Sequence, residues 1–220
     1  VRAEYAGLID ELYHGWFAEG RVTTPPEALD FWGKLLEAYI AKCDWFQPMD
    51  ISLPGDQITE DTPFHFGPAV FDLLRSPPLL DIVEQLIGPE LTSNPIQHVR
   101  IKPPATALQA DEIRPHIAGT DWHQDRAVAL EEADQTEMVT VWIAVTDATP
   151  ENGCLQVIPK AQDQITLPHC PKVQTAIADG FIDEARAVPL PVRAGGIVLF
   201  HPLTLHASLT NQTDSFRWSF

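Results

Sequence analysis

The chain has 220 residues and a formal net charge of −17, with 45% hydrophobic and 20% charged residues. This length and composition fit one globular domain with a substantial core. An acidic surface repels nucleic acid and anionic lipid, which argues against both as partners. The three cysteines are scattered and form no CxxC pair, which argues against a disulfide scaffold or a cysteine-based zinc site and indicates a reducing, cytoplasmic location.

The first ninety residues are expected to be helical. Apolar side chains at three- and four-residue spacing predict helices over residues 1–19, 24–43, 68–75 and 76–88. The second helix is predicted to begin with Thr24 as its N-cap, followed by proline at the first helical position. Residues 44–64 read as a long loop, either a substrate rim or a plain connection.

From about residue 91 the pattern changes to short strands separated by turns. Strands are predicted at residues 97–102, 120–125, 138–146, 154–158, 188–192, 197–200 and 215–220. Residues 159–187 are expected to form a second long loop. Strands at such intervals indicate an antiparallel sandwich or barrel. We therefore expect one domain over residues 1–220, with a helical flank at 1–90 and a jelly-roll core at 91–220.

The stretch Trp122-His123-Gln124-Asp125 carries a candidate metal site. On a strand, alternation would point the side chains of His123 and Asp125 to the same face. A third ligand must come from elsewhere, and His206 is favoured over the alternative, His201, because small residues follow it. Two histidines and one carboxylate leave coordination positions open, which is typical of non-haem Fe(II) sites that react with oxygen.

A cationic side chain follows the distal histidine on the last predicted strand. Arg217 has a planar guanidinium that can bind the far carboxylate of a keto acid through two parallel hydrogen bonds, which Lys would match poorly. Ser208 can add a hydroxyl donor to the same carboxylate. These residues predict a keto-acid pocket beside the metal.

At these residues the sequence resembles the phytanoyl-CoA dioxygenase family of Fe(II)/2-oxoglutarate oxygenases. The resemblance runs through Lys102-Pro103-Pro104, Trp122-His123-Gln124-Asp125, Val141-Trp142-Ile143-Ala144, the stretch from Glu151 to Pro159, the stretch from Gly195 to Phe200, His206-Ala207-Ser208 and Arg217. The resemblance covers roughly residues 97–220, whereas the first ninety residues resemble the family only in their helical character. H-x-D alone is a weak motif, but H-x-D, the Glu-Asn-Gly turn, the distal histidine and the arginine are specific in this order.

The resemblance implies a double-stranded β-helix, which is a cupin-like jelly roll, and an enzyme that uses Fe(II), 2-oxoglutarate and O2. It implies that His123, Asp125 and His206 bind the iron. The residues that it places around 2-oxoglutarate are Arg217, Ser208, Gln124, Trp142 and His98. Asp125 stands where halogenating relatives carry a small residue, which favours hydroxylation, desaturation or a related oxidation over halogenation. Hydroxylation of a small organic substrate, with release of succinate and CO2, is the expected reaction.

Two other functions fit parts of this pattern. A cupin-like metal-binding barrel without oxygenase activity, such as an isomerase or a sensor, would share the metal ligands but would have no use for Arg217. A carbohydrate-binding jelly roll would leave the His/Asp/His set unexplained. The long loops expected to form the pocket of the primary substrate carry no recognisable motif.

Overall fold

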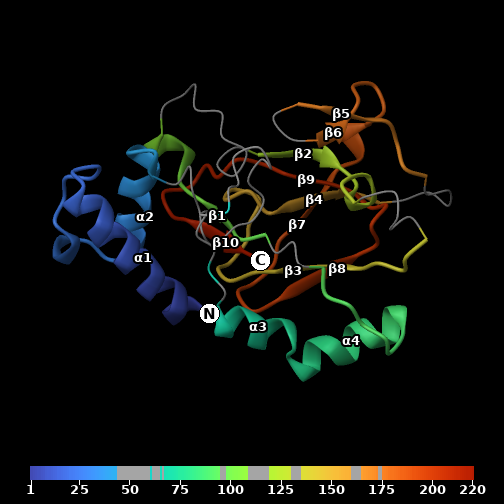
Figure 1. Ribbon diagram of the computed structural model, residues 1–220. Coiled ribbons are helices and arrows are strands. Elements are labelled where there is room, and N and C mark those ends of the chain that lie inside the picture. The colour runs from blue at the N-terminus through green and yellow to red at the C-terminus, as the bar shows by residue number, and fades with distance from the viewer. Residues whose placement is uncertain are drawn as a thin grey trace. The chain divides into compact units, whose positions relative to one another are not determined.

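The computed structural model describes residues 1–43, 60, 65, 67–94, 98–108, 119–129, 135–159, 165–172 and 175–220. The chain forms two compact units, Val1–Val99 and Arg100–Phe220. The first unit contains α-helices and the second contains antiparallel strands (Figure 1). The chain is therefore mainly β with N-terminal helices, as the sequence predicts. The loop predicted over 44–64 lies almost wholly outside the described residues.

The described part of the first unit contains the helices α1 (Arg2–Ala18), α2 (Phe31–Ile40), α3 (Pro68–Leu74) and α4 (Pro77–Ile87). Their positions agree with the predicted helical stretches, apart from the start of α2. Helices α1 and α2 pack against each other, and Tyr13 of α1 and Ala38 of α2 belong to one buried cluster with Val22 and Cys43. Among the described residues, no helix is both long and apolar enough to cross a membrane.

The start of α2 differs from the prediction. The prolines after Thr24 lead into a short 3-10 helix, η1 (Pro26–Ala28), and the chain is extended again at Leu29. Helix α2 begins at Phe31 because the carboxylate of Asp30 accepts a hydrogen bond from the backbone N–H of Gly33, at 2.8 Å, as an N-cap does. The prediction of Thr24 as N-cap is therefore wrong.

The described strands of the second unit are β1 (Arg100–Lys102), β2 (Thr120–His123), β3 (Thr140–Ile143), β4 (Leu155–Ile158), β5 (His169–Pro171), β6 (Thr175–Ile177), β7 (Val188–Leu190), β8 (Ile197–Phe200), β9 (Leu205–Ser208) and β10 (Arg217–Ser219). One antiparallel sheet has the order β2-β9-β4-β7. Strand β1 pairs with β10, and β3 pairs with β8. Reciprocal backbone hydrogen bonds between Ile143 and Phe220, at 2.8 and 3.0 Å, connect β3 with the end of the β10 segment. A bridge between Ala144 and Ser219 lies beside them, so these strands follow the order β1-β10-β3-β8.

Two predictions about this unit are corrected. The loop predicted over 159–187 contains the β5–β6 hairpin, which the sequence pattern conceals because Pro171 ends β5 and proline is rare inside strands. Strand β9 was not predicted as a strand. It lies centrally in its sheet, between β2 and β4.

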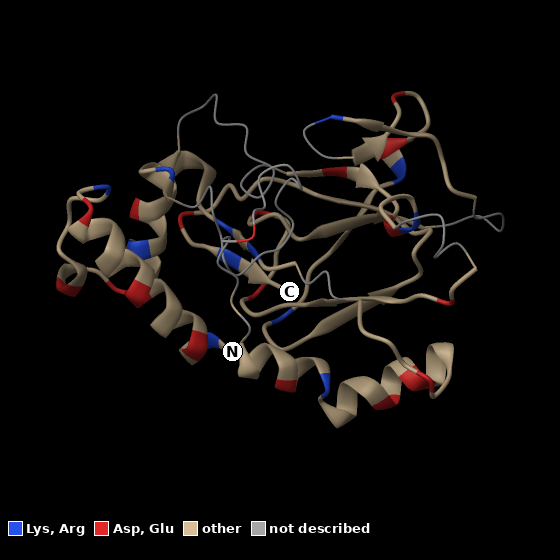
Figure 2. Ribbon diagram, in the orientation of Figure 1, with Lys and Arg blue, Asp and Glu red and all other residues tan. Residues whose placement is uncertain are grey.

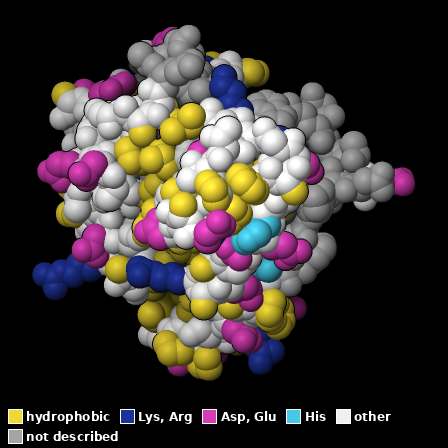
Figure 3. All heavy atoms as spheres, turned by 90° about the vertical axis from the view of Figure 1, so that its left-hand side faces the viewer, with side chains coloured by type: hydrophobic (Ala, Val, Ile, Leu, Met, Phe, Trp, Pro, Cys, Tyr) yellow, Lys and Arg dark blue, Asp and Glu magenta, His cyan; other side chains and the backbone are white. Residues whose placement is uncertain are grey.

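Acidic side chains are dispersed over the described residues rather than gathered in one place. Figure 2 shows Asp and Glu on the helices and on the connections of both units. On the face turned to the viewer in Figure 3, acidic groups are separated by apolar and uncharged surface. Among the described residues in these views, the acidic groups therefore mark no single site.

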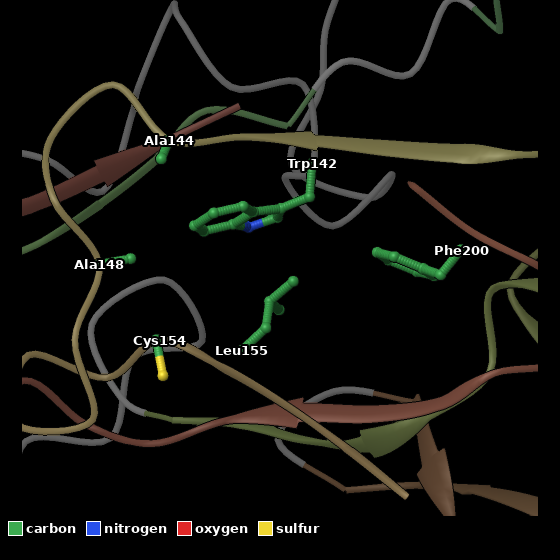
Figure 4. Close-up of a cluster of buried hydrophobic side chains, with 6 residues drawn as sticks. All are labelled: Trp142, Ala144, Ala148, Cys154, Leu155 and Phe200. Atoms are coloured by element: carbon green, nitrogen blue, oxygen red, sulfur yellow. The ribbon is translucent and has the colours of Figure 1, made fainter. Parts of the chain in front are cut away.

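The hydrophobic core of the second unit contains side chains from both sets of strands. Trp142 of β3, Phe200 of β8 and Leu155 of β4 point toward one another (Figure 4). Each is at most 9% exposed, and burying one such side chain contributes roughly 1.5–3 kcal/mol. Ala144, Ala148 and Cys154 complete the cluster. This core joins β3 and β8 to β4, which is the neighbour of β9.

Candidate metal centre

His123 and Asp125 meet His206, which is distant from them in sequence, where β2 and β9 pair. His123, the last residue of β2, lies opposite His206 of β9. The Nε2 atom of each histidine lies 3.6 Å from Oδ1 of Asp125. One potential ligand atom from each residue lies within 4.8 Å of the others. Atoms that bind one ion at about 2 Å are roughly 3 Å apart, so the three ligand atoms would draw closer together on binding the same ion.

Asp125 reaches this point by a different route from the predicted one. Strand β2 ends at His123, and Asp125 begins the short 3-10 helix η5 (Asp125–Ala127). The backbone N–H of Ala127 donates to the carbonyl of Gln124 at 3.0 Å, which closes this turn. The side chains of His123 and Asp125 converge as expected, but the explanation by strand alternation is wrong.

Hydrogen bonds to backbone carbonyls orient both histidine rings. Nδ1 of His123 lies 2.8 Å from the carbonyl of Asp121, and Nδ1 of His206 lies 3.0 Å from the carbonyl of Thr204. A carbonyl only accepts, so Nδ1 carries the proton and the Nε2 lone pair is free for a metal. Burial, followed by the effect of His206, lowers the pKa of His123 to about 4. At neutral pH this ring is therefore in the form that binds metals.

The second oxygen of Asp125 is also held. The hydroxyl of Thr140, the first residue of β3, donates to Oδ2 at 2.5 Å. This bond leaves Oδ1 directed toward the two histidines. The role of Thr140 was not predicted, because a threonine in a strand carries no signal of such a role.

A second group of polar side chains is buried on strands connected to this centre. Ser208 lies two residues after His206 on β9, so both side chains point to the same face, roughly 7 Å apart along the strand. Nζ of Lys102 donates to the Ser208 hydroxyl at 2.7 Å and to the carbonyl of Leu209 at 2.8 Å. Lys102 of β1 lies directly opposite Arg217 of β10. The antiparallel pairing therefore places two cationic side chains next to each other.

Both cationic side chains are almost completely buried, with Lys102 1% and Arg217 2% exposed. Burial, and next the charge of Arg217, lowers the pKa of Lys102 well below its usual range. Burial, and next the charge of Arg100, lowers the pKa of Arg217 to about 10. None of the described Asp or Glu residues is buried to this degree. A buried charge without an opposite charge beside it is costly, so these two side chains are suited to binding an anion.

The guanidinium of Arg217 has unused hydrogen-bonding capacity. Nη1 donates to the hydroxyl of Ser219 at 2.7 Å, whereas no described atom accepts a hydrogen bond from Nε. The guanidinium carbon lies 5.8 Å from the ring centroid of Trp142, within cation–π range. Trp142 thus borders Arg217 and also belongs to the hydrophobic core.

The remaining predicted residues are placed as follows. His201, the alternative third ligand, is exposed, accepts a hydrogen bond from the backbone N–H of Leu203 at 3.2 Å and does not join the triad. Gln124 is buried beside the metal ligands, with its amide bonded to backbone groups. His98 is exposed and belongs to the unit Val1–Val99, so its role in the pocket stays a prediction. The contribution of Lys102 was not predicted.

Comparison with known proteins identifies the family. The sequence profile of phytanoyl-CoA dioxygenases matches residues 26–219. The chain belongs to the phytanoyl-CoA dioxygenase family. It is 28% identical over 170 residues to a probable phytanoyl-CoA dioxygenase of Caenorhabditis elegans, which covers 73% of this chain and 52% of that protein. It is 38% identical over 104 residues to phytanoyl-CoA dioxygenase domain-containing protein 1 of Danio rerio, which covers 43% of this chain and 35% of that protein.

Two solved structures are also similar to this chain. The apo form of the non-heme monooxygenase ThoJ superposes with a TM-score of 0.54 at 32% identity, covering 68% of this chain and 52% of ThoJ. EvdO2 from Micromonospora carbonacea var. aurantiaca, complexed with 2-oxoglutarate, gives a TM-score of 0.51 at 25% identity, covering 69% of this chain and 60% of EvdO2. The chain spans about half the length of the Caenorhabditis elegans family member and about a third of the Danio rerio one. The predicted family resemblance is confirmed.

Proposed function

We propose that this protein is an Fe(II)- and 2-oxoglutarate-dependent oxygenase that hydroxylates a small organic molecule. The observation that carries the proposal is that two groups of polar side chains meet the same face of β9, one through His206 and the other through Ser208. One is the His123–Asp125–His206 triad, and the other is the buried pair Lys102 and Arg217, reached through Ser208. Membership of the phytanoyl-CoA dioxygenase family supports this function, as does the similarity to EvdO2 complexed with 2-oxoglutarate.

We further infer that the second unit is a double-stranded β-helix within one oxygenase domain over residues 1–220. The strand orders β2-β9-β4-β7 and β1-β10-β3-β8 are those expected of two four-stranded sheets in a jelly roll. In such a fold the first and last strands pair, as β1 and β10 do. This topology also explains how the metal ligands come from opposite ends of the strand sequence.

The residues present fit the metal and co-substrate. The Nε2 atoms of His123 and His206 and Oδ1 of Asp125 would hold Fe(II), and such a set leaves positions open for other ligands. When bound, Fe(II) with 2-oxoglutarate and O2 would supply the oxidation and release succinate and CO2. Arg217 and Lys102 would bind the distal carboxylate through charge-assisted hydrogen bonds. An isomerase or a sensor with the same metal ligands would leave these two buried cations without an anion.

Loss of a metal ligand tests this function. We expect Asp125→Ala and His206→Ala each to abolish succinate formation in the presence of Fe(II), 2-oxoglutarate and ascorbate. The loss should exceed the roughly 10–100-fold effect of removing an outer-shell partner, because a ligand itself is removed. His201→Ala is the matched control, since that histidine is exposed and lies outside the triad. Circular dichroism checks that all three variants fold, and undiminished succinate formation in both ligand variants would contradict the assignment.

A further inference from the structure

We propose that Gln124 and His169 are positioning residues that fix the backbone between two metal ligands, His123 and Asp125. This role rests on the proposed function, because it concerns the same metal site. Gln124 is the single residue between the two ligands. Its backbone conformation therefore decides how the imidazole and the carboxylate are placed relative to each other.

The side chain of Gln124 is fully engaged by backbone groups. It is 1% exposed, and Nε2 donates to the carbonyls of Ile165 at 3.0 Å and Leu203 at 2.9 Å. Oε1 accepts from the backbone N–H of Leu167 at 2.7 Å. An amide has two N–H hydrogens, and both are used here, so neither is available to a co-substrate. The amide instead ties the segment 165–167 and the β8–β9 connection to the metal-binding strand.

His169, the first residue of β5, holds the backbone of the same residue. Its Nε2 accepts a hydrogen bond from the backbone N–H of Gln124 at 3.1 Å. Its Nδ1 lies 2.7 Å from the carbonyl of Leu167, and because a carbonyl only accepts, the proton is on Nδ1. His123 and His206 are oriented in the same way, each through Nδ1 and the carbonyl two residues earlier. In His123 and His206 the Nε2 atom faces Asp125. In His169 the Nε2 atom faces the backbone N–H of Gln124, the residue between His123 and Asp125.

These contacts leave residue 124 little freedom. Its N–H and side chain are bound as described, and its carbonyl accepts from Ala127 at 3.0 Å. A change in its extended backbone, with φ −127° and ψ 131°, would swing Asp125 away from His123. A metal site tolerates displacements of only about 0.5 Å. Segment 165–169 can therefore control metal affinity although it contributes no ligand to the triad.

We call the hydrogen bonds that Gln124 and His169 make around residue 124 the clamp. The clamp can be tested in the wild-type protein without metal. Nitrogen-15 NMR of the His169 ring should show the neutral tautomer protonated at Nδ1. The backbone amide of Gln124 should exchange with solvent slowly, as a buried, bonded amide does. A ring protonated at Nε2, or a Gln124 amide that exchanges as fast as an exposed one, would overturn the proposal. This measurement does not depend on whether iron binds, so it separates the clamp from the proposed function.

The consequence for the metal is tested with variants under anaerobic Fe(II) titration. His169→Phe and Gln124→Met should each raise the Kd for Fe(II) about 10-fold, as the loss of an outer-shell partner does. His169→Gln should recover most of the affinity, because an amide oxygen can accept the Gln124 N–H in place of Nε2. Ile9→Val removes a buried methyl group from the other unit and is the control for lost stability. It should lower the midpoint of thermal unfolding and leave the Kd unchanged.

Each outcome of the Fe(II) titration either supports or contradicts the positioning role of Gln124 and His169. Unchanged Kd values in His169→Phe and Gln124→Met, or an equal rise in Ile9→Val, would overturn the positioning role. Failure of His169→Gln to recover affinity would do the same for the hydrogen bond to Gln124. A wild-type protein that binds no Fe(II) would overturn the proposed function and the positioning role together, while the NMR experiment would still report whether the clamp exists.

Discussion

At the scale of single residues, Lys102 and Arg217 indicate the kind of co-substrate more specifically than the metal ligands do. Histidine and carboxylate groups also meet in proteins that bind no keto acid. Lys102 and Arg217 together, with no described buried carboxylate beside them, favour an anionic ligand. Because Lys102 already donates to Ser208, the Ser208 hydroxyl can direct its own proton to a bound carboxylate.

Replacing Lys102 should therefore affect the co-substrate more than the metal. We expect Lys102→Met to weaken binding of 2-oxoglutarate about 30-fold or more, which corresponds to about 2 kcal/mol for losing one side of a buried charge pair. Fe(II) affinity should change little, because Lys102 contributes no ligand. Calorimetric titration of each ligand measures the two effects separately. Lys172→Met is the matched control, since Lys172 is a partly exposed lysine paired with Asp179, and equal losses in the two variants would contradict the role of Lys102.

Much of the site was predictable from the sequence because its residues are chemically unusual. His123, Asp125, His206 and Arg217 stand out by type and spacing, and the structure brings the first three together. Lys102 does not stand out, because lysine is almost always exposed and only the pairing with Arg217 reveals its environment. The backbone contacts of Gln124 were equally hidden, since they depend on segments far away along the chain.

At the scale of elements, β9 organises the site. It carries His206 and Ser208 and lies between β2 and β4 in its sheet. This strand was not predicted, because its small residues lack the alternating β-branched pattern of most strands. The turn that ends at Gly153 was predicted, and it packs closely against the residue after β9. A Cβ atom at Gly153, whose φ is +79°, would lie 2.2 Å from the carbonyl oxygen of Leu209.

Substituting Gly153 should therefore disturb β9. Gly195 has a similar φ of +84°, but a Cβ there would meet no described atom within 4 Å. Gly195→Ala should cost about 1–2 kcal/mol from its left-handed backbone alone. Gly153→Ala should cost more than about 3 kcal/mol, because the methyl group also collides with backbone. Urea denaturation measures both values, and equal losses would show that the close approach to Leu209 is unimportant.

At the scale of the whole molecule, charge and fold follow from different features of the sequence. The change from helical to strand patterns near residue 91 lies close to the division between Val99 and Arg100. Composition alone predicts an acidic surface. Figures 2 and 3 show that the described Asp and Glu residues are dispersed in these views. Composition cannot show that Lys102 and Arg217 are both buried and lie opposite each other on paired strands. The protein thus combines a negative exterior with a positive interior site.

This combination predicts that salt stabilises the protein, either by screening the negative exterior or by supplying an anion to Lys102 and Arg217. Screening of a formal charge of −17 weakens self-repulsion in the folded state, because the Debye length falls from about 10 Å at 0.1 M to about 3 Å at 1 M. Sodium chloride should therefore raise the midpoint of thermal unfolding of the ligand-free protein. If chloride instead acts by entering the pocket of Lys102 and Arg217, the increase will be smaller in Lys102→Met. Equal increases in wild type and variant indicate general screening, and a midpoint that falls with salt would contradict both explanations.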